Sequence, residues 1–369
     1  MASIEKRNGR YRARYRTPTG ESRCLTFDRK VDAEKFLTSV EHRKLTGEYV
    51  DAAAGKVTLK SYAEQWRTSQ VQHRPSTIVT VESHLRRHVY PAFGDRPIAS
   101  LRPSEVQAWV KGLSEHLAPS TVEVVYRYLV SILRSAADDR VIAANPAARV
   151  KLPKVDKPVV VPLEVEQVER LAAAMTDRYR AAVVLAAGTG LRVSECLGLT
   201  VDRVDFLRRT IRVDRQLVML AGSTSIFGPP KTASSVRTVP MPTIVGEALA
   251  QHLATYPAGQ DGLIFTTPTG APVRRTTFWD EWRRTVKAAG MAKGTRFHEL
   301  RHFYASLLIR YGESVKVVQV RLGHASAAET LDTYSHLWPD SEDRTRAAVD
   351  AVLGSSRVPA VSRASGGEA

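Results

Sequence analysis

Residues 322–336 read LGHASAAETLDTYSH and predict two helices joined by a tight turn. Gly323 has the position of a helix C-cap, because glycine readily adopts the left-handed backbone conformation that often ends a helix. Ser326 and Glu329 have the spacing of a capping box, which marks the first turn of the next helix. Tyr334 then lies about two turns into that second helix. The stretch therefore places a tyrosine hydroxyl shortly after a glycine-terminated helix.

Two stretches earlier in the chain also place charged residues at turns. Residues 188–195, GTGLRVSE, predict a tight turn that leads into a helix, with Arg192 at its start and Glu195 one turn later. Residues 230–240, PKTASSVRTVP, predict a β-turn that presents Lys231, because proline and small polar residues favour turns. These three charged residues are candidate site residues. Arg192 alone would more often be a surface cation and Lys231 alone a solvated loop lysine, while the alternative for Glu195 is a simple pair with a nearby arginine.

The pentapeptide HELRH, which begins at His298, fits the HExxH pattern of zinc proteases. In that interpretation His298 and His302 would bind zinc, and Glu299 would act as the catalytic base. The pattern fixes three positions, so chance matches are frequent, and such an enzyme also requires a further ligand. We therefore favour a site without a metal ion.

The same pentapeptide has a second interpretation, as part of an amphipathic helix. His298 and Arg301 are three residues apart, which puts them side by side on one exposed face. An arginine fork can bind two oxygens of a phosphate while the imidazole donates or shuttles a proton. We expect His302 and His336 to have structural roles. The apolar face would belong to the core and comprises Phe297, Leu300, Tyr304, Leu307, Leu308 and Tyr311.

The composition of the chain points to the same kind of ligand. The 369 residues include 54 Lys and Arg against 38 Asp and Glu, a formal net charge of +16. Such an excess favours a polyanionic partner, with nucleic acid first. A hydrophobic content of 43% is enough for packed cores, and no apolar run approaches the ~20 residues of a membrane helix. Two distant cysteines, Cys24 and Cys196, exclude a disulfide framework and fit a reducing cytoplasm.

The N-terminal block, residues 1–55, is predicted to be a small sheet with one helix. Residues 10–16, RYRARYR, alternate strictly and predict a strand, with a returning strand at residues 24–27 and a helix from about Val31. One face of the first strand carries Arg10, Arg12, Arg14 and Arg16. A face with charges of one sign favours binding in a DNA groove over the alternative, an edge strand protected by charge.

The rest of the chain divides by composition and periodicity into four segments. The predicted segments are a helical block at 56–147, an extended linker at 148–163, a block of helices and strands at 164–338 and a tail at 339–369. In the helical block, Ser120 and Glu123 predict a capping box at the start of the last helix. The strands of the third block lie between residues 204 and 239, and the tail is expected to be helical at first and then disordered.

Together, the four motifs and their order resemble the tyrosine recombinase (phage integrase) family. The basic sheet and the helical block are also similar to the N-terminal parts of larger phage-type integrases. The resemblance implies a multidomain fold, with a small α+β arm-binding domain, an all-α core-binding domain and a mainly α catalytic domain that contains a small antiparallel sheet.

The resemblance also implies how a DNA phosphate would be held. Arg192 and Arg301 would bind the scissile phosphate, and His324 would support it. Glu195 would be a supporting acidic residue that fixes the geometry of the arginine or of the histidine. No metal ion and no cofactor is implied.

The implied reaction is covalent. Tyr334 would attack a DNA phosphodiester to give a 3′-phosphotyrosine, while His298 assists proton transfer and Lys231 reaches the minor groove from its β-turn. One ester replaces another, so the bond energy is retained and no ATP is needed. The implied function is site-specific recombination that integrates and excises a phage or another mobile element.

Two alternatives share this fold. One is a type IB topoisomerase that relaxes DNA, and the other is an inactive DNA-binding regulator. The implied partners of a recombinase are double-stranded DNA with core and arm attachment sites, further copies of the chain in a homotetramer, a host DNA-bending protein and a directionality factor, with no membrane. The implied location is the cytoplasm of a bacterial host, in association with the nucleoid.

Overall fold

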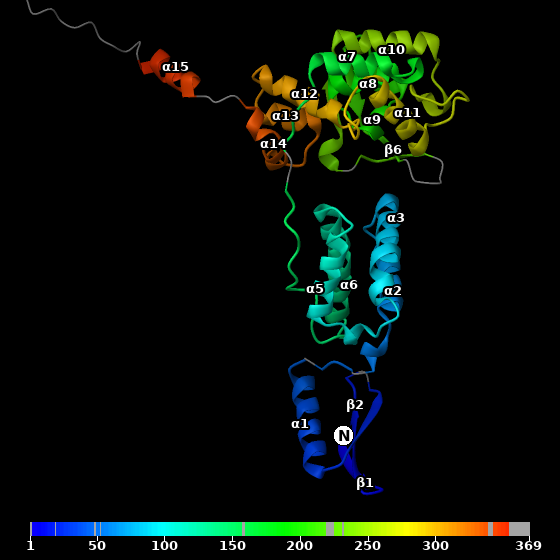
Figure 1. Cartoon of the computed structure of the whole chain (residues 1–369), viewed down its shortest axis with the longest axis vertical. Coiled ribbons are helices and arrows are strands. Elements are labelled where there is room, and N and C mark those ends of the chain that lie inside the picture. The colour runs from blue at the N-terminus through cyan, green and yellow to red at the C-terminus, as the bar shows by residue number, and fades with distance from the viewer. Residues whose placement is uncertain are drawn as a thin grey trace, which may run out of the picture. The chain divides into compact units, whose positions relative to one another are not determined.

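A computed structural model of the chain (Figure 1) describes residues 2–18, 20–47, 49–51, 53–156, 159–218, 225–230, 232–338 and 342–353. These residues belong to two compact units, which span residues 1–157 and 158–369. Lys231 lies outside the described residues, and so does the end of the tail, where disorder was predicted. Among the helices of the described ranges, none is long and apolar enough to cross a membrane.

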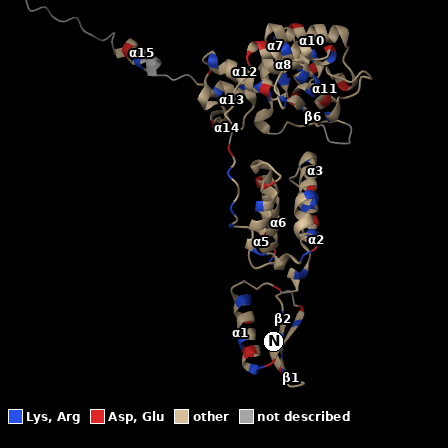
Figure 2. Cartoon of the chain, viewed as in Figure 1, with Lys and Arg blue, Asp and Glu red and all other residues tan. Residues whose placement is uncertain are grey.

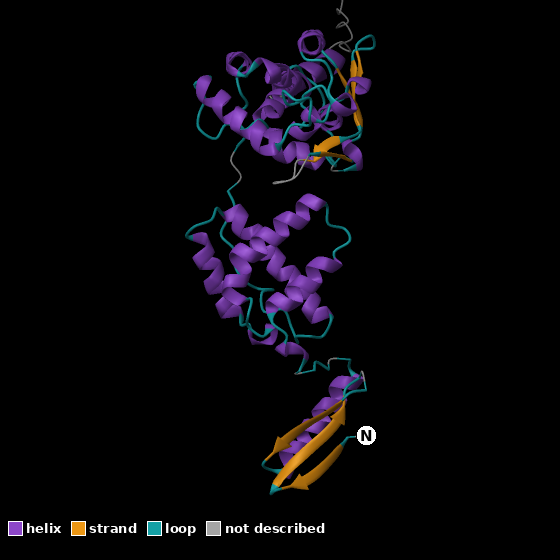
Figure 3. Cartoon of the chain, turned by 90° about the vertical axis from the view of Figure 1, so that its right-hand side faces the viewer, coloured by secondary structure: helices purple, strands orange, loops and turns teal. Residues whose placement is uncertain are grey.

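The N-terminal residues form a three-stranded antiparallel sheet with a helix against one face (Figure 3). In order along the chain the elements are β1 (Ser3–Arg7), β2 (Arg10–Arg16), β3 (Ser22–Phe27) and α1 (Lys30–Leu45). The central strand β2 lies where the alternating sequence predicts it. Its Tyr15 is buried, and the ring meets that of Phe36 on α1 edge-on, with 5.6 Å between centroids. The sequence does not reveal β1, because its residues, SIEKR, lack an alternating apolar pattern.

A group of helices follows in the same unit. Its elements are η1 (Ala54–Lys56), α2 (Leu59–Ser69), α3 (Pro75–His84), the π-helical turn η2 (Leu85–Val89), α4 (Tyr90–Phe93), η3 (Ile98–Ser100), α5 (Pro103–Ser114) and α6 (Pro119–Asp138). The apolar face of α6 is buried, as its periodicity predicts. The predicted capping box is wrong, because α6 begins before Ser120, at Pro119, whose fixed φ suits the first helical position. Glu123 pairs instead with Arg127, at 2.8 Å between Oε1 and Nη2.

The described residues between 151 and 164 form neither helix nor strand, as their prolines predict. The second unit then contains α7 (Val165–Ala174), α8 (Asp177–Thr189), α9 (Val193–Leu197), η4 (Val201–Arg203), β4 (Val204–Asp205), β5 (Thr210–Val213), β6 (Gln216–Val218), β7 (Ile226–Gly228), η5 (Ala233–Ser235), β8 (Arg237–Pro240), α10 (Thr243–Thr255), η6 (Gln260–Gly262), α11 (Arg275–Ala288), α12 (Glu299–Arg310), α13 (Val315–Leu322), α14 (Ala327–Tyr334), η7 (Ser335–Leu337) and α15 (Glu342–Leu353). The helix α15 lies in the tail, whose first part was predicted to be helical.

Helix α8 is the centre of the second unit. It packs against α7, α10 and α12, and most of its residues are buried (Figure 1). Two small antiparallel sheets, β4-β5-β8 and β6-β7, complete the unit. Leu300 and Tyr304 of α12 are buried, as predicted. Tyr311 is not: it follows the end of α12 and is 84% exposed, because the helical register that would turn it inward stops at Arg310.

Candidate active site

The site begins at the end of α8, where Gly190 turns the chain. Gly190 has a φ of +66°, and a Cβ atom on it would lie 2.4 Å from the Tyr304 ring, so a side chain at this position would be both strained and obstructed. After the turn, Arg192 occupies the N-cap position of α9, and Glu195 lies in its first turn. The motif around Gly190 thus has the local structure that the sequence predicts.

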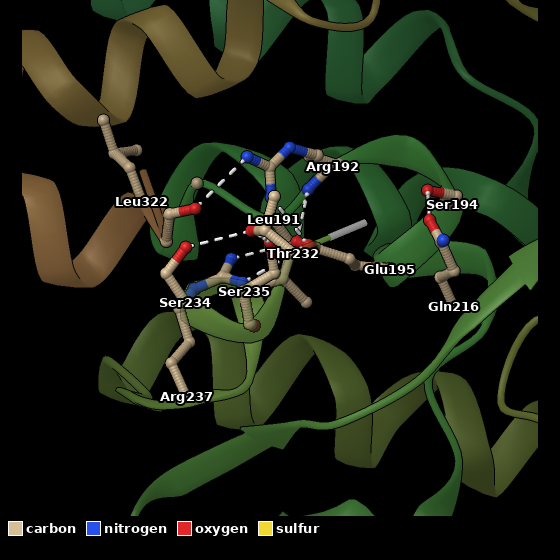
Figure 4. Close-up of polar contacts among 12 residues, drawn as sticks. Leu191, Arg192, Ser194, Glu195, Gln216, Thr232, Ser234, Ser235, Arg237 and Leu322 are labelled. Atoms are coloured by element: carbon tan, nitrogen blue, oxygen red, sulfur yellow. Dashed lines mark hydrogen bonds and ion pairs between the residues drawn. The ribbon is translucent and has the colours of Figure 1, made fainter. Parts of the chain in front are cut away.

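Glu195 is buried between two arginines (Figure 4). Its carboxylate accepts a hydrogen bond from Nη1 of Arg192 at 2.9 Å and another from Nη2 of Arg237 at 2.9 Å. Burial alone would raise the pKa of Glu195, but the charges of Arg237 and Arg192 outweigh it and lower the pKa below its usual value. Glu195 is therefore ionised at neutral pH and fixes the Arg192 guanidinium. Sequence reasoning missed Arg237, because nothing in its motif distinguishes it from a surface arginine.

Arg301 lies inside the protein, so the expectation of an exposed His298–Arg301 pair is wrong. Its side chain is among the largest that are fully buried, because it points inward from the first turn of α12. It donates from Nη1 to the Gly190 carbonyl at 2.7 Å and from Nη2 to the Leu322 carbonyl at 2.5 Å. Burial, followed by the charge of Arg192, lowers the pKa of Arg301 to about 9. A buried cation of this kind favours an anion beside it, and a phosphate would supply one.

The turn between α13 and α14 brings the two arginines together. Gly323 ends α13 with a φ of +66°, as the sequence predicts, and its carbonyl accepts from Nη2 of Arg192 at 3.4 Å. The preceding carbonyl, of Leu322, is the one that Arg301 contacts. The guanidinium groups of Arg192 and Arg301 therefore converge on consecutive carbonyl groups, directly before His324.

His324 and Tyr334 follow this turn as stacked rings. Their centroids are 6.5 Å apart and their planes differ by 8°. Nδ1 of His324 lies 2.9 Å from the hydroxyl oxygen of Thr330, which orients the imidazole. Burial, followed by the charges of Arg301 and Arg192, lowers the pKa of His324 to about 3, so the ring is neutral at neutral pH. Ser326 caps α14, as predicted, by accepting from the backbone N–H of Glu329.

Tyr334 is buried at the end of α14 and is in contact with a histidine that sequence analysis treats as structural. Its hydroxyl oxygen lies 2.7 Å from Nδ1 of His302, and the tyrosine is 1% exposed. Burial raises the pKa of Tyr334 to about 12. His302 was missed, although its spacing from His298 indicates that both lie on one side of α12. His336 contacts the Val160 carbonyl through Nε2, in accordance with a structural role.

His298 precedes α12 and reaches solvent. Its ring meets the His302 ring edge-on, with 4.9 Å between centroids. The packing around the ring, followed by the charges of His302 and Arg301, lowers the pKa of His298 to about 3. The described residues contain no group of three or more His, Cys, Asp or Glu side chains that could hold a metal ion.

The segment after Lys231 contacts the arginine site. The hydroxyl groups of Thr232 and Ser235 are 2.8 Å apart, and Nη1 of Arg192 donates to the Ser235 hydroxyl at 3.4 Å (Figure 4). Lys231 itself lies outside the described residues. The next residue, Thr232, is nevertheless connected to Arg192 through the Ser235 hydroxyl, which contacts both side chains.

The arginines of β2 lie along the N-terminal sheet (Figure 2). They are Arg10, Arg12, Arg14 and Arg16. The expectation that this face has charges of one sign is wrong. Arg10 pairs with Asp28 at 2.9 Å, and Arg14 pairs with Glu5 at 3.3 Å. Glu5 reaches this face because β1, which the sequence did not reveal, pairs with β2.

Comparison with known proteins assigns the chain to a family. It matches the phage integrase N-terminal domain over residues 3–47, the phage integrase central domain over residues 59–152 and the phage integrase family over residues 162–340. The integrase of Mycobacterium phage D29 is 27% identical over 339 residues, which cover 87% of this chain and 88% of that protein.

Solved structures agree with this assignment. The Tn1549 transposon integrase in complex with transposon right end DNA is 25% identical, with a TM-score of 0.70 over 80% of this chain and 100% of that chain. A lambda integrase tetramer bound to a Holliday junction has the same fold, with 20% identity and a TM-score of 0.59 over 88% of this chain and 96% of that chain. The three matched regions follow one another along nearly the whole sequence, and the chain belongs to the phage integrase family of tyrosine recombinases.

Proposed function

We propose that this recombinase cuts and rejoins DNA through a 3′-phosphotyrosine on Tyr334, for the integration and excision of a phage or another mobile element. The observation that supports it best is the convergence of Arg192 and Arg301 on consecutive carbonyls next to His324, which stacks on Tyr334. Two guanidinium groups beside a tyrosine hydroxyl are suited to a phosphodiester and its charged transition state.

The arginines replace the metal ions that other phosphoryl-transfer enzymes use. Negative charge increases on the non-bridging oxygens as Tyr334 attacks, and Arg192 and Arg301 lie where they can neutralise it. Their positions are fixed before DNA binds, Arg192 by Glu195 and Arg301 by two carbonyls, so little reorganisation is needed during the reaction. His324 would donate an N–H to the phosphate. Lys231 would protonate the leaving 5′ oxygen.

The three main segments of the chain would have different tasks on the DNA. Residues 1–55 would bind arm sites, residues 56–147 would bind the core site, and residues 164–338 would carry out the chemistry. The lambda integrase structure is a tetramer on a Holliday junction, and we infer four copies of this chain on its own junction. A host DNA-bending protein and a directionality factor would complete the assembly.

A nicked duplex tests the chemistry. DNA that flanks the coding sequence supplies the candidate attachment site, and a nick close to the cleavage point lets a short 5′-hydroxyl fragment diffuse away, so the covalent complex accumulates. The wild type should give a protein–DNA band on a denaturing gel, with or without EDTA. Tyr334→Phe should bind the duplex equally and give no band. A band from that variant would assign the nucleophile to another residue.

The same preparation separates the alternatives. A recombinase joins two marked attachment sites into hybrid products, whereas a topoisomerase relaxes supercoiled plasmid without exchanging partners. An inactive regulator forms no covalent complex with any duplex. Loss of the complex in EDTA and its recovery with zinc would favour the zinc interpretation of His298 and His302.

A further inference from the structure

We propose that His302 is the base that removes the proton of Tyr334 when the tyrosine attacks DNA. This proposal rests on the role of Tyr334 as nucleophile. Its basis is the contact between Nδ1 of His302 and the Tyr334 hydroxyl oxygen, which are 2.7 Å apart. The general base of a reaction must lie within hydrogen-bond reach of the proton that it takes, and 2.7 Å is well within that reach.

The ring geometry supports a hydrogen bond between the two side chains. The planes of His302 and Tyr334 are inclined at 65°, with 5.5 Å between centroids, so the edge of the imidazole is turned to the tyrosine. His324 covers the tyrosine differently, through a parallel stack. The ring contact of His298 is with His302. Of the three histidines, His302 is therefore the one that the geometry assigns to the hydroxyl.

The surroundings of His302 keep its imidazole neutral. Burial lowers the pKa of His302, Glu299 opposes this effect, and Arg296 and Arg301 add to it. Within the described part of the chain, its ring contacts His298 and Tyr334, and His324 is close enough for His302 to help lower the His324 pKa. A neutral imidazole that carries its proton on Nε2 has a lone pair on Nδ1, which can accept the tyrosine proton.

Tyr334 requires such a base. Because its pKa is raised to about 12, the fraction of tyrosinate at neutral pH is on the order of 10⁻⁵. The arginines near the site favour the anion but do not remove the proton. A neutral imidazole in hydrogen-bond contact provides the missing acceptor, in a position where water is excluded from the pair.

In the proposed step, one phosphate ester replaces another and the tyrosine proton moves to the imidazole. Oη of Tyr334 forms a bond to phosphorus, its O–H bond breaks, and the proton passes to Nδ1 of His302, which becomes an imidazolium. The bond between phosphorus and the 5′ oxygen breaks, and that oxygen leaves with a proton from a separate acid, for which Lys231 is the candidate. In rejoining, a 5′ hydroxyl attacks the phosphotyrosine, and His302 returns its proton to the departing tyrosine oxygen.

His302→Asn tests this proposal, because the asparagine oxygen can lie near the position of Nδ1 and accept a hydrogen bond, but it cannot take the proton. The variant should bind the nicked duplex like the wild type and form the covalent complex ~10²–10⁴-fold more slowly at neutral pH. As pH rises from about 6.5 to 9, the wild-type rate should stay level while the variant rate rises about tenfold per pH unit with the tyrosinate fraction.

Two controls distinguish this role from others. His336→Asn makes the same substitution at a nearby histidine whose nitrogen contacts a backbone carbonyl, and it should keep the level pH profile. A duplex with sulfur in place of the bridging 5′ oxygen needs no acid, so it should not restore cleavage by His302→Asn. Rescue by sulfur would place His302 on the leaving-group side and overturn the proposal.

A role of His302 in orienting Tyr334, without proton transfer, predicts the opposite result for His302→Asn. If His302 only orients Tyr334, His302→Asn should cleave within a few fold of the wild type, with a level pH profile, and the proposal fails. His302→Ala is measured in parallel as a second variant, because both roles predict its loss of rate but only a base predicts recovery at high pH. Absence of a covalent complex from the wild type is a different result, which would overturn the proposed function itself.

Discussion

Arg237 and Glu195 form an ion pair that is almost completely shielded from water. Their side chains are 3% and 2% exposed, and Nη2 and Oε2 are 2.9 Å apart. The same carboxylate holds Arg192, whose side chain is 24% exposed. Arg237 is further held by the Arg321 carbonyl, which accepts from its Nε at 2.8 Å. The buried pair is thus the fixed support for Arg192, the arginine that we propose binds the phosphate.

Glu195→Gln should weaken both the fold and the reaction. Removing the carboxylate charge leaves Arg237 buried without a counter-charge, and breaking a buried pair typically costs about 3–5 kcal/mol. It also loosens Arg192, so we expect cleavage to slow by ~10²-fold. Thermal unfolding and covalent-complex formation measure the two effects. Asp177→Asn breaks an exposed pair with Arg180 and serves as control, with a loss below about 1 kcal/mol.

The contribution of Glu195 to folding stability should decrease as the pH falls. Its pKa is lowered in the folded state, so its stabilising effect is complete above the unfolded pKa of about 4.3 and is lost as pH falls through the folded value. Urea unfolding between about pH 6 and pH 3 should show a wild-type advantage over Glu195→Gln that shrinks below about pH 4. A constant difference over that range would mean that the carboxylate charge is not what stabilises the fold.

The features of the site that the sequence predicts depend on residues close to one another in the chain. Gly190 and Gly323 end helices because the backbone at these positions needs a positive φ. Ser326 caps α14 by accepting from the backbone N–H of Glu329, three residues later. Features produced by long-range packing were missed. Nothing within HELRH shows that Arg301 would point inward to carbonyls of other segments.

Two contacts of site residues were missed for the same reason, because they join segments that are far apart in the sequence. His302 meets a hydroxyl 32 residues away, and Arg237 meets a carboxylate 42 residues away. Neither pairing leaves a signal in a single sequence, because each depends on how helices and loops of the second unit pack. The arginine face of β2 shows the same effect, since its acidic neighbour Glu5 comes from a strand that pairs with it.

Removal of residues 1–55 should abolish tight binding to arm sites and preserve weak binding to the core site. The reason is that the arginines of β2 lie in a sheet with its own small core around Tyr15 and Val40. Footprinting of the truncated protein on a full attachment site measures both kinds of protection. Continued protection of the arm sites would show that another part of the chain binds them.

Deletion of residues 340–369 should weaken recombination and synapsis more than binding to a single site. The helix α15 lies in this tail, and its Val349, Val352 and Leu353 are 49%, 68% and 67% exposed, which suits a contact with another copy of the chain. Gel-shift titration and a recombination assay on paired sites compare the two losses. Equal losses would indicate that the tail packs on its own subunit.

Lys231→Ala should slow cleavage while DNA affinity stays nearly unchanged, if this lysine is the general acid. The 5′ oxygen is a poor leaving group without a proton, and general acid catalysis is typically worth ~10²–10⁴ in rate. Lys316→Ala changes an exposed lysine of α13 and is the matched control. If Lys231 only contacts a phosphate, its loss should instead weaken binding and reduce the salt dependence by about one unit of slope.

The sulfur-substituted duplex decides between these roles of Lys231. A thiolate leaves without protonation, so Lys231→Ala should cleave this substrate nearly as fast as the wild type. The same substrate should not help His302→Asn, because sulfur replaces the leaving oxygen and not the attacking one. Opposite responses of the two variants would place an acid and a base on opposite sides of the phosphorus. Failure of sulfur to rescue Lys231→Ala would transfer the role of acid to another residue, with His298 as the next candidate.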